Sequence, residues 1–218
     1  MAGAGEIDRP QLGEFLGAYW REVYLYIRRV RAGTNEEAKD LTQGFLAHLI
    51  ESDVLAGFRS ADGRLRSFLK TSLRNFLTDT YRRRTTERRG GGAPTFSFDP
   101  ADVERLDVAA RSPDTPDVLF DREWAWHLLR ESLDAVRRKL EVDGKSVAWK
   151  IYEQYDLAGD AAPTGRVLAA EFGLTENQVD KALARVRRDV REELLRRQSE
   201  QVASEEELFA EYRELFGS

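Results

Sequence analysis

The chain has 218 residues, with 34 Lys and Arg against 39 Asp and Glu and a formal net charge of -5. Its 41% hydrophobic and 33% charged residues exclude a wholly disordered chain, and it lacks an apolar run long enough to span a membrane. The absence of cysteine excludes disulfides and thiolate chemistry, and with only His48 and His127 a histidine-rich zinc site is excluded too. The amino terminus has no signal-peptide pattern, so we expect a soluble, cytoplasmic protein without a metal or cofactor.

Apolar residues recur at three- and four-residue spacing along the amino-terminal part of the chain. The spacing predicts a helix over residues 11–31 and another over 64–84. Between them, the capping-box pattern Thr34-x-x-Glu37 predicts the start of a further helix. Strand-like alternation does not persist anywhere, so the sequence predicts an all-α fold.

Residues 91–117 have the composition of a linker. They begin within the run Gly90-Gly91-Gly92 and contain Pro94, Pro100, Pro113 and Pro116. Helical spacing resumes over 117–140, 146–155 and 163–172, in the last of which Val167, Leu168 and Ala170 are expected to face inward. Thr175-x-x-Gln178 then opens another helix, and Ser204-x-x-Glu207 a short one.

These elements predict two small helical domains joined by a flexible linker. The expected ranges are 1–90 for the first domain, 91–117 for the linker, 118–197 for the second domain and 198–218 for an acidic helical tail. The tail helix packs on the second domain, covers one of the basic DNA-binding surfaces or binds a regulator.

Charge is distributed in blocks. Residues 64–89 hold nine cations and two anions, a net charge of +7, and residues 181–197 carry a net charge of +4. Residues 99–143 and the tail each carry a net charge of -5. Two basic segments separated by an acidic one indicate two contact points for a polyanion.

The carboxyl-terminal half contains a helix-turn-helix pattern. A helix ending at Phe172 is followed by Gly173-Leu174-Thr175 and a basic helix. In this motif the second helix enters the DNA major groove through its first residues, where Asn and Gln can pair with adenine and Glu with cytosine. The candidate DNA-binding residues are Thr175, Glu176, Asn177, Gln178, Lys181, Arg185 and Arg188. The alternative is an ordinary helical hairpin with a solvated basic face.

The helix over 64–84 interleaves aromatic residues with cations. Such a surface suits single-stranded nucleic acid, whose bases stack on aromatic rings while its phosphates meet cations. The candidate contact residues are Arg66, Lys70, Arg74, Asn75, Arg82, Arg83 and Arg84. On the alternative reading, Phe68 and Phe76 have core spacing and are simply buried.

Together these segments resemble a sigma-70 family RNA polymerase sigma factor of the extracytoplasmic-function type. The resemblance rests on Asp40-Leu41-Thr42-Gln43, on Arg74-Asn75 followed by Arg82-Arg83-Arg84, and on the segment from Gly173 to Val179. It implies a region 2-like helical bundle and a region 4-like helix-turn-helix domain. It covers residues 12–90 and 118–197.

The resemblance implies a division of roles. Core RNA polymerase would be bound by Glu37, Asp40, Leu41, Gln43 and Phe45. The candidate residues between Arg66 and Arg84 would bind the minus-10 promoter element as it opens, and those from Thr175 to Arg188 the duplex minus-35 element. The expected partners are therefore core polymerase and promoter DNA.

Two positions depart from the family pattern. Gly44 stands where an acid is common, and Asp180 stands where Lys is common. An anti-sigma factor or a Ser/Thr kinase is a candidate regulator, with Thr34, Thr85 and Thr86 as candidate phosphorylation sites. Phosphate at Thr85 would reduce the local positive charge.

Other functions stay open. The main alternative is a helix-turn-helix transcriptional regulator that binds duplex operators without being a polymerase subunit. A second is an interaction protein whose basic faces meet acidic partners. An enzyme is the least expected class, because no phosphate-binding loop, activated nucleophile or metal cluster can be recognised.

Overall fold

The computed structural model describes residues 9–31, 33–52, 64–84, 98–202 and 204–216. Every regular element in these ranges is a helix, which confirms the all-α prediction. Within the same ranges, no helix has the length and apolar content needed to cross a membrane. The chain divides into two compact units.

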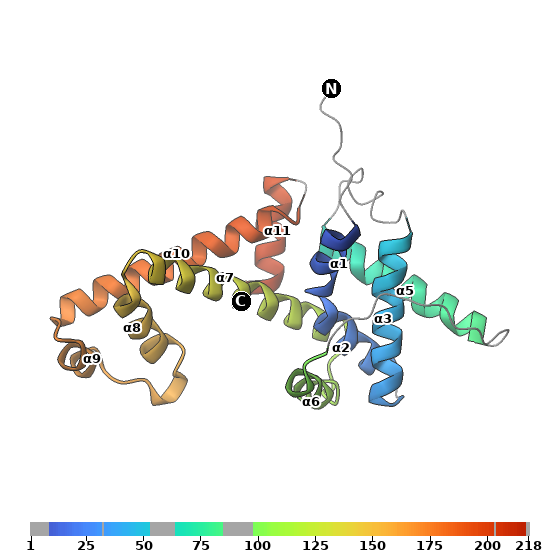
Figure 1. Cartoon of the computed structure of the whole chain (residues 1–218), viewed down its shortest axis with the longest axis horizontal. Coiled ribbons are helices and arrows are strands. Elements are labelled where there is room, and N and C mark those ends of the chain that lie inside the picture. The colour runs from blue at the N-terminus through green and yellow to red at the C-terminus, as the bar shows by residue number, and fades with distance from the viewer. Residues whose placement is uncertain (1–8, 32, 53–63, 85–97, 203, 217–218) are drawn as a thin grey trace, which may run out of the picture. The chain divides into compact units, whose positions relative to one another are not determined.

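The first unit comprises residues 1–126 with 201–203 and 214–218. Its helices are α1 (Arg9–Gly17), α2 (Trp20–Val30), α3 (Asn35–Glu51), α5 (Leu65–Arg84), α6 (Pro100–Ala109) and the first turns of α7 (Pro116–Val142). Helix α3 packs on α1 and α2 (Figure 1). The core includes the fully buried side chains of Tyr24, Ile27, Phe45 and Leu69.

Helix α3 begins at the predicted capping box. The Thr34 hydroxyl accepts a hydrogen bond from the Glu37 backbone N–H (3.2 Å), and the Glu37 carboxylate accepts one from the Thr34 N–H (3.0 Å). These bonds satisfy two backbone donors that the helix leaves unpaired.

The prediction of a linker without regular structure is wrong for residues 100–109, which form α6. Asp99 caps this helix by accepting a hydrogen bond from the Ala101 N–H (2.8 Å). Pro100 occupies the first turn, where the missing N–H and fixed φ of proline favour a helix rather than break it. Residues 91–97 of the expected linker lie outside the described ranges.

Helix α6 packs on α2 and so belongs to the first unit. Val103 and Leu106 are buried. Asp107 accepts hydrogen bonds from Arg28 Nε (2.6 Å) and from the Tyr24 hydroxyl (2.9 Å). The acidic side chains of this segment are therefore held by cations and hydroxyls of α2.

The second unit comprises residues 127–200 and 204–213. It contains the rest of α7, α8 (Ser146–Asp156), a short 3-10 turn (Gly159–Ala161), α9 (Gly165–Phe172), α10 (Glu176–Ser199) and most of α11 (Glu205–Phe216). The predicted boundary before residue 118 is wrong, because α7 is continuous from Pro116 and its first turns belong to the first unit.

The predicted tail is shared between the units. Residues 204–213 belong to the second unit, whereas Gln201 and Glu214 belong to the first. The carbonyl of Gln201 accepts a hydrogen bond from the Leu65 N–H (3.0 Å), and its side-chain amide donates to the Tyr19 hydroxyl (3.0 Å).

Candidate nucleic-acid interfaces

The turn between α9 and α10 has the geometry of a tight helix-turn-helix. Gly173 ends α9 with φ +66° and ψ 33°, in the left-handed region that favours glycine. The Leu174 N–H donates to the Ala169 carbonyl (2.8 Å). Thr175 then starts α10, so three residues connect the two helices.

A single core fixes α8, α9 and α10 against one another (Figure 1). Its buried members are apolar residues from all three helices and from α7. They include Val136, Leu140, Trp149, Ile151, Leu168, Val179, Leu183 and Val186. Val167 is 53% exposed and Ala170 is also exposed, so the prediction that both face inward is wrong, whereas Leu168 is buried as expected.

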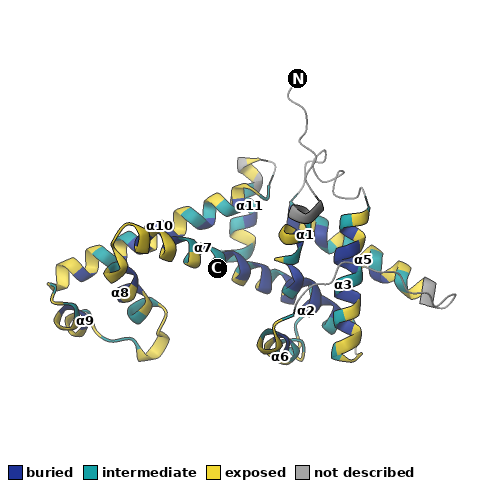
Figure 2. Ribbon diagram, viewed as in Figure 1, coloured by how far each residue is buried: buried dark blue, intermediate teal, exposed yellow. Residues whose placement is uncertain are grey.

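The first turns of α10 present polar side chains to solvent. Glu176, Asn177, Gln178 and Lys181 are all exposed, as Figure 2 shows for this end of the helix. Together with the buried Val179 and the tight turn, this exposure gives the second unit a polar helix terminus able to enter a groove.

Two of the predicted base-reading residues also form the helix cap. The Thr175 hydroxyl accepts from the Gln178 N–H (3.3 Å), and Gln178 Oε1 accepts from the Thr175 N–H (2.8 Å). The cap fixes Gln178 through Oε1 only. Its Nε2 donors are therefore the atoms it can direct to a ligand.

The arginines further along α10 are ion-paired. Arg188 Nη2 lies 3.2 Å from Asp189 Oδ1, and Arg185 Nε lies 3.9 Å from Asp189 Oδ2. Arg187 makes two hydrogen bonds to Asp156 (2.7 and 2.9 Å) and so links α10 to α8. Arg185 and Arg188 therefore have an acidic neighbour on α10, although the Arg188 side chain remains 62% exposed.

Sequence reasoning missed one cation of this surface. Arg166 lies exposed in the first turn of α9, and in the described part of the chain it forms no ion pair. The first helix of a helix-turn-helix crosses the DNA backbone. A cation in the first turn of that helix could therefore have been predicted from the sequence as a phosphate contact.

The cations of α5 form a row. Arg66, Lys70 and Arg74 are four residues apart and therefore share one helix face. Facing them are Asp117 and Asp121, which are also four residues apart in the first turns of α7.

Each cation of the row has a carboxylate partner within the first unit. Arg66 Nη1 lies 2.6 Å from Asp121 Oδ1, and Lys70 Nζ lies 2.8 Å from the same oxygen. Arg74 pairs with Asp117. Two carboxylates thus compensate part of the charge of the three-cation row that the sequence assigned to DNA.

The end of α11 adds a third carboxylate. Glu214 pairs with Arg66 and lies 2.7 Å from Arg64 Nη1. Hydrogen bonds from Arg64 and then from Arg66 lower the pKa of Glu214, so this carboxylate stays charged. The end of α11 thus contributes an anion to the basic helix.

Burial corrects the role of one predicted contact residue. The Arg66 side chain is 4% exposed, so it cannot touch DNA in this arrangement. Lys70 is 14% exposed and Arg74 51%. Asn75 and Arg82 are exposed, and Arg83 and Arg84 belong to the last turn of α5 although their side chains lie outside the described set.

The predicted polymerase-binding residues of α3 divide into two groups. Leu41 (7% exposed) and Phe45 (0%) are core residues, so the prediction that they form a docking surface is wrong. Asp40 is exposed, and Gln43 is partly exposed. Glu37 is exposed but engaged in the capping box.

Gly44 is partly buried and lies next to α5. A Cβ at this position would lie 3.5 Å from Phe76 Cζ. Phe76 packs against the rings of Phe45 and His48. The residue that departs from the family pattern therefore lies against the α3–α5 contact.

The candidate phosphorylation sites differ in what the structure describes. The Thr34 hydroxyl is used in the capping box at the start of α3. Thr85 and Thr86 lie outside the described residues.

Compared with protein-family models, curated proteins and solved structures, the chain shows no match.

Proposed function

We propose that this chain is a sigma factor of the extracytoplasmic-function type, which binds core RNA polymerase in the cytoplasm and directs it to promoters. The observation that carries the proposal is that each unit has a different surface suited to nucleic acid. One is the exposed terminus of α10 behind the Gly173 turn, and the other is the row on α5. The first suits duplex DNA and the second suits unpaired DNA.

The α10 terminus would read the minus-35 element in the major groove. Asn177 and the Gln178 amide can bond an adenine edge, and Glu176 can accept from cytosine. Lys181, one turn further, can reach a phosphate, which positions the helix without reading sequence. Arg166 can contribute a second phosphate contact from α9.

Strand opening requires no external energy source if the unpaired strand is bound better than the duplex. Extruding a base costs roughly a few kcal/mol, and stacking it on an aromatic side chain regains roughly 1–3 kcal/mol. Lys70, Arg74 and Asn75 on α5 can add phosphate and base contacts. Together, stacking and these contacts can offset the cost of extruding a base.

The carboxylates of α7 and Glu214 would restrain this activity in the free chain. Asp117, Asp121 and Glu214 occupy the cations that phosphates would need. We expect the pairs to part when polymerase binds, which frees Arg66 as well. The isolated chain should therefore bind promoter duplex weakly.

Polymerase docking would use the exposed side of α3. Asp40 and Gln43 can meet a basic partner surface, whereas Leu41 and Phe45 support the helix from the core. Such docking is electrostatic and should weaken as salt rises.

Binding to purified bacterial core RNA polymerase tests the proposal. We expect the full chain to co-elute with core polymerase on size-exclusion chromatography. Asp40→Ala should weaken this association at least about fivefold, as expected when an interface charge is removed. Asp143→Ala, which removes an equal charge from the turn after α7, is the matched control and should bind like wild type. No association by the wild-type chain would refute the proposal.

The second candidate is a helix-turn-helix regulator that is not a polymerase subunit. The completeness of the α8–α10 core supports it, because this unit needs no polymerase to form a duplex-reading helix terminus. Tight, sequence-selective duplex binding by the chain alone, with no polymerase association, would favour this candidate. An anti-sigma factor or a Ser/Thr kinase stays a proposed regulator under the first candidate.

A further inference from the structure

The first two turns of α10 carry an acidic edge. Glu176 and Asp180 are four residues apart, so they lie on one side of the helix, and both are exposed. Asn177 and Lys181 have the same spacing and lie on the adjacent side. The helix end that suits a major groove therefore holds two carboxylates and only one cation over residues 176–181.

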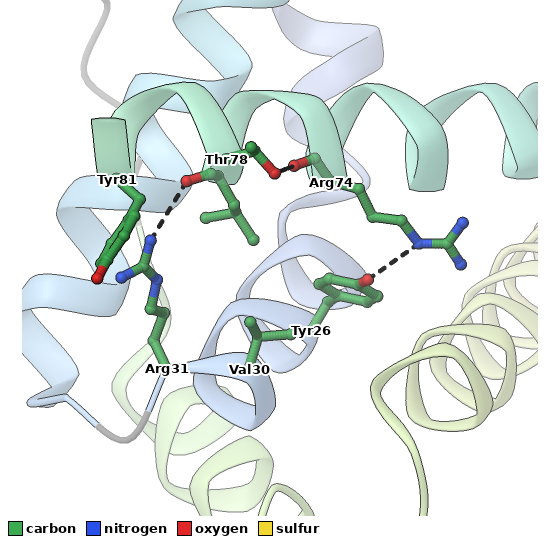
Figure 3. Close-up of a pocket in the computed structure, with 7 residues that line it drawn as sticks. Tyr26, Val30, Arg31, Arg74, Thr78 and Tyr81 are labelled. Atoms are coloured by element: carbon green, nitrogen blue, oxygen red, sulfur yellow. Dashed lines mark hydrogen bonds between the residues drawn. The ribbon is translucent and has the colours of Figure 1, made fainter. Parts of the chain in front are cut away.

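These two acids differ from the acids near α5, which have cationic partners. Asp117 binds Arg74, whose Nε also donates to the Tyr26 hydroxyl (3.2 Å), and Arg74 and Tyr26 line a groove of about 540 Å³ between α2 and α5 (Figure 3). Among the described residues, neither Glu176 nor Asp180 has an ion-pair or hydrogen-bond partner. Both carboxylates are therefore free to accept a hydrogen bond from a ligand.

Helix stability accounts for one of the two acids. A carboxylate in the first turn interacts favourably with the helix dipole, and this effect falls off within that turn. Glu176 is the first residue of α10, whereas Asp180 lies in the second turn. The helix dipole thus gives Asp180 no role, and the described residues offer it no internal bond.

A carboxylate in the major groove can accept only from a base amino group. Phosphates carry the same charge as the carboxylate, so it cannot serve as a backbone contact. Guanine and thymine present acceptors there, which a carboxylate repels. Adenine presents an acceptor beside its amino group and suits an amide, whereas the amino group of cytosine is the usual donor to Asp and Glu.

We propose that Asp180 is a specificity-determining residue, which selects cytosine at one position of the duplex bound by α10. The assignment of this duplex to the minus-35 element rests on the proposed function. Asp180 is one of the two positions at which the chain departs from the family pattern. On this proposal its carboxylate reads a base, in addition to omitting the phosphate contact that a Lys would make.

Selection from a randomised duplex library tests the proposal. The full chain binds the library at low salt, alone in one arm and with core RNA polymerase in the other, and the bound duplexes are sequenced. With wild type we expect one position at which cytosine is favoured about tenfold over guanine and thymine, the size of a good base contact. Asp180→Asn should remove this preference and favour adenine at the same position, because an amide pairs with the adenine edge. The other selected positions should stay unchanged.

Asp134→Asn is the matched control. It makes the same substitution at an exposed position of α7 in the second unit. This variant should select the same sequences as wild type. Both variants should unfold at the wild-type temperature in circular dichroism, so that a changed preference reports on the contact with DNA.

Two results would overturn the proposal. One is a wild-type selection with no cytosine-preferring position in either arm. The other is a cytosine preference that Asp180→Asn retains or that Asp134→Asn removes equally.

The two arms also separate this proposal from the proposed function. A chain that binds core polymerase but shows no position dependent on Asp180 keeps the sigma-factor proposal and loses the role of this residue. A chain that binds no polymerase, yet selects cytosine through Asp180 by itself, keeps the role of the residue and favours the helix-turn-helix regulator.

Discussion

Gly173 is the residue on which the geometry of the helix-turn-helix depends. Its φ of +66° lies in a region that costs a residue with a Cβ about 1–2 kcal/mol. No atom lies within 4 Å of the position where a Cβ would be built, so steric crowding by neighbours adds nothing to that cost.

Gly173→Ala should therefore lower the free energy of unfolding by about 1–2 kcal/mol. Gly165→Ala is a matched control, because Gly165 has equally open surroundings but no positive φ. It lies in the first turn of α9 and should be neutral or slightly stabilising. Denaturant unfolding followed by circular dichroism measures both. Equal stabilities of the two variants would show that the left-handed turn is not required.

Residue-scale features could be predicted where their causes are local. Both capping boxes, at Thr34 and Thr175, are confirmed because the four residues involved determine the bonds. The inward faces of short helices were harder to assign. In α9 the pattern of small apolar residues fits two adjacent faces, and the core selects Leu168 and Ala169.

Helix α6 shows why elements cannot always be read from local signals. Its two buried residues, Val103 and Leu106, give little periodicity, and Pro100 reads as a helix breaker unless the helix start is known. The contacts that stabilise it come from α2, about eighty residues earlier in the chain. Sequence spacing carries no signal for such pairs.

The contact between α2 and α6 predicts a dependence of stability on alkaline pH. Burial, followed by the hydrogen bond to Asp107, raises the pKa of Tyr24. The native state thus keeps the Tyr24 proton at a pH where the unfolded chain loses it. The Tyr24 hydroxyl therefore contributes its full stabilisation to the native state below about pH 10, the ordinary pKa of tyrosine. This stabilisation is lost as the pH rises further.

Tyr24→Phe should remove this contribution. At neutral pH the variant should be less stable by about 1.5–3 kcal/mol, since it loses a hydrogen bond to the Asp107 carboxylate. Between about pH 10 and 11 the difference in free energy of unfolding between wild type and variant should narrow. Only wild type loses stability there, because its unfolded chain releases the Tyr24 proton that its native state still holds. Unfolding curves at neutral and alkaline pH measure the gap. A gap that stays constant with pH would contradict the assigned cause.

At the scale of the whole molecule, alternating charge blocks become internal ion pairs. The acidic segment over 99–143 was expected to be a flexible tether, yet its first part is bound to the first unit through Asp102, Asp107, Asp117 and Asp121. Composition predicted the opposite charges and the presence of two units. It could not predict which cations the acids meet, because that depends on the packing of α6 and α7.

Under the proposed function, the same pairing would explain how a chain of net charge -5 acts on DNA. The cations of α5 are ion-paired in this structure, and on the proposal they would become available when a partner separates the carboxylates. Activity on DNA should therefore depend on that partner far more than on the concentration of the chain.

Run-off transcription of fragmented genomic DNA of the source organism by purified core polymerase, with and without the chain, tests this account most directly. We predict that the chain causes initiation at a discrete set of sites that core polymerase alone does not use. We also predict that Asn177→Ala weakens initiation on duplex templates more than on templates already opened over the minus-10 element. Start sites identical with and without the chain would contradict the account.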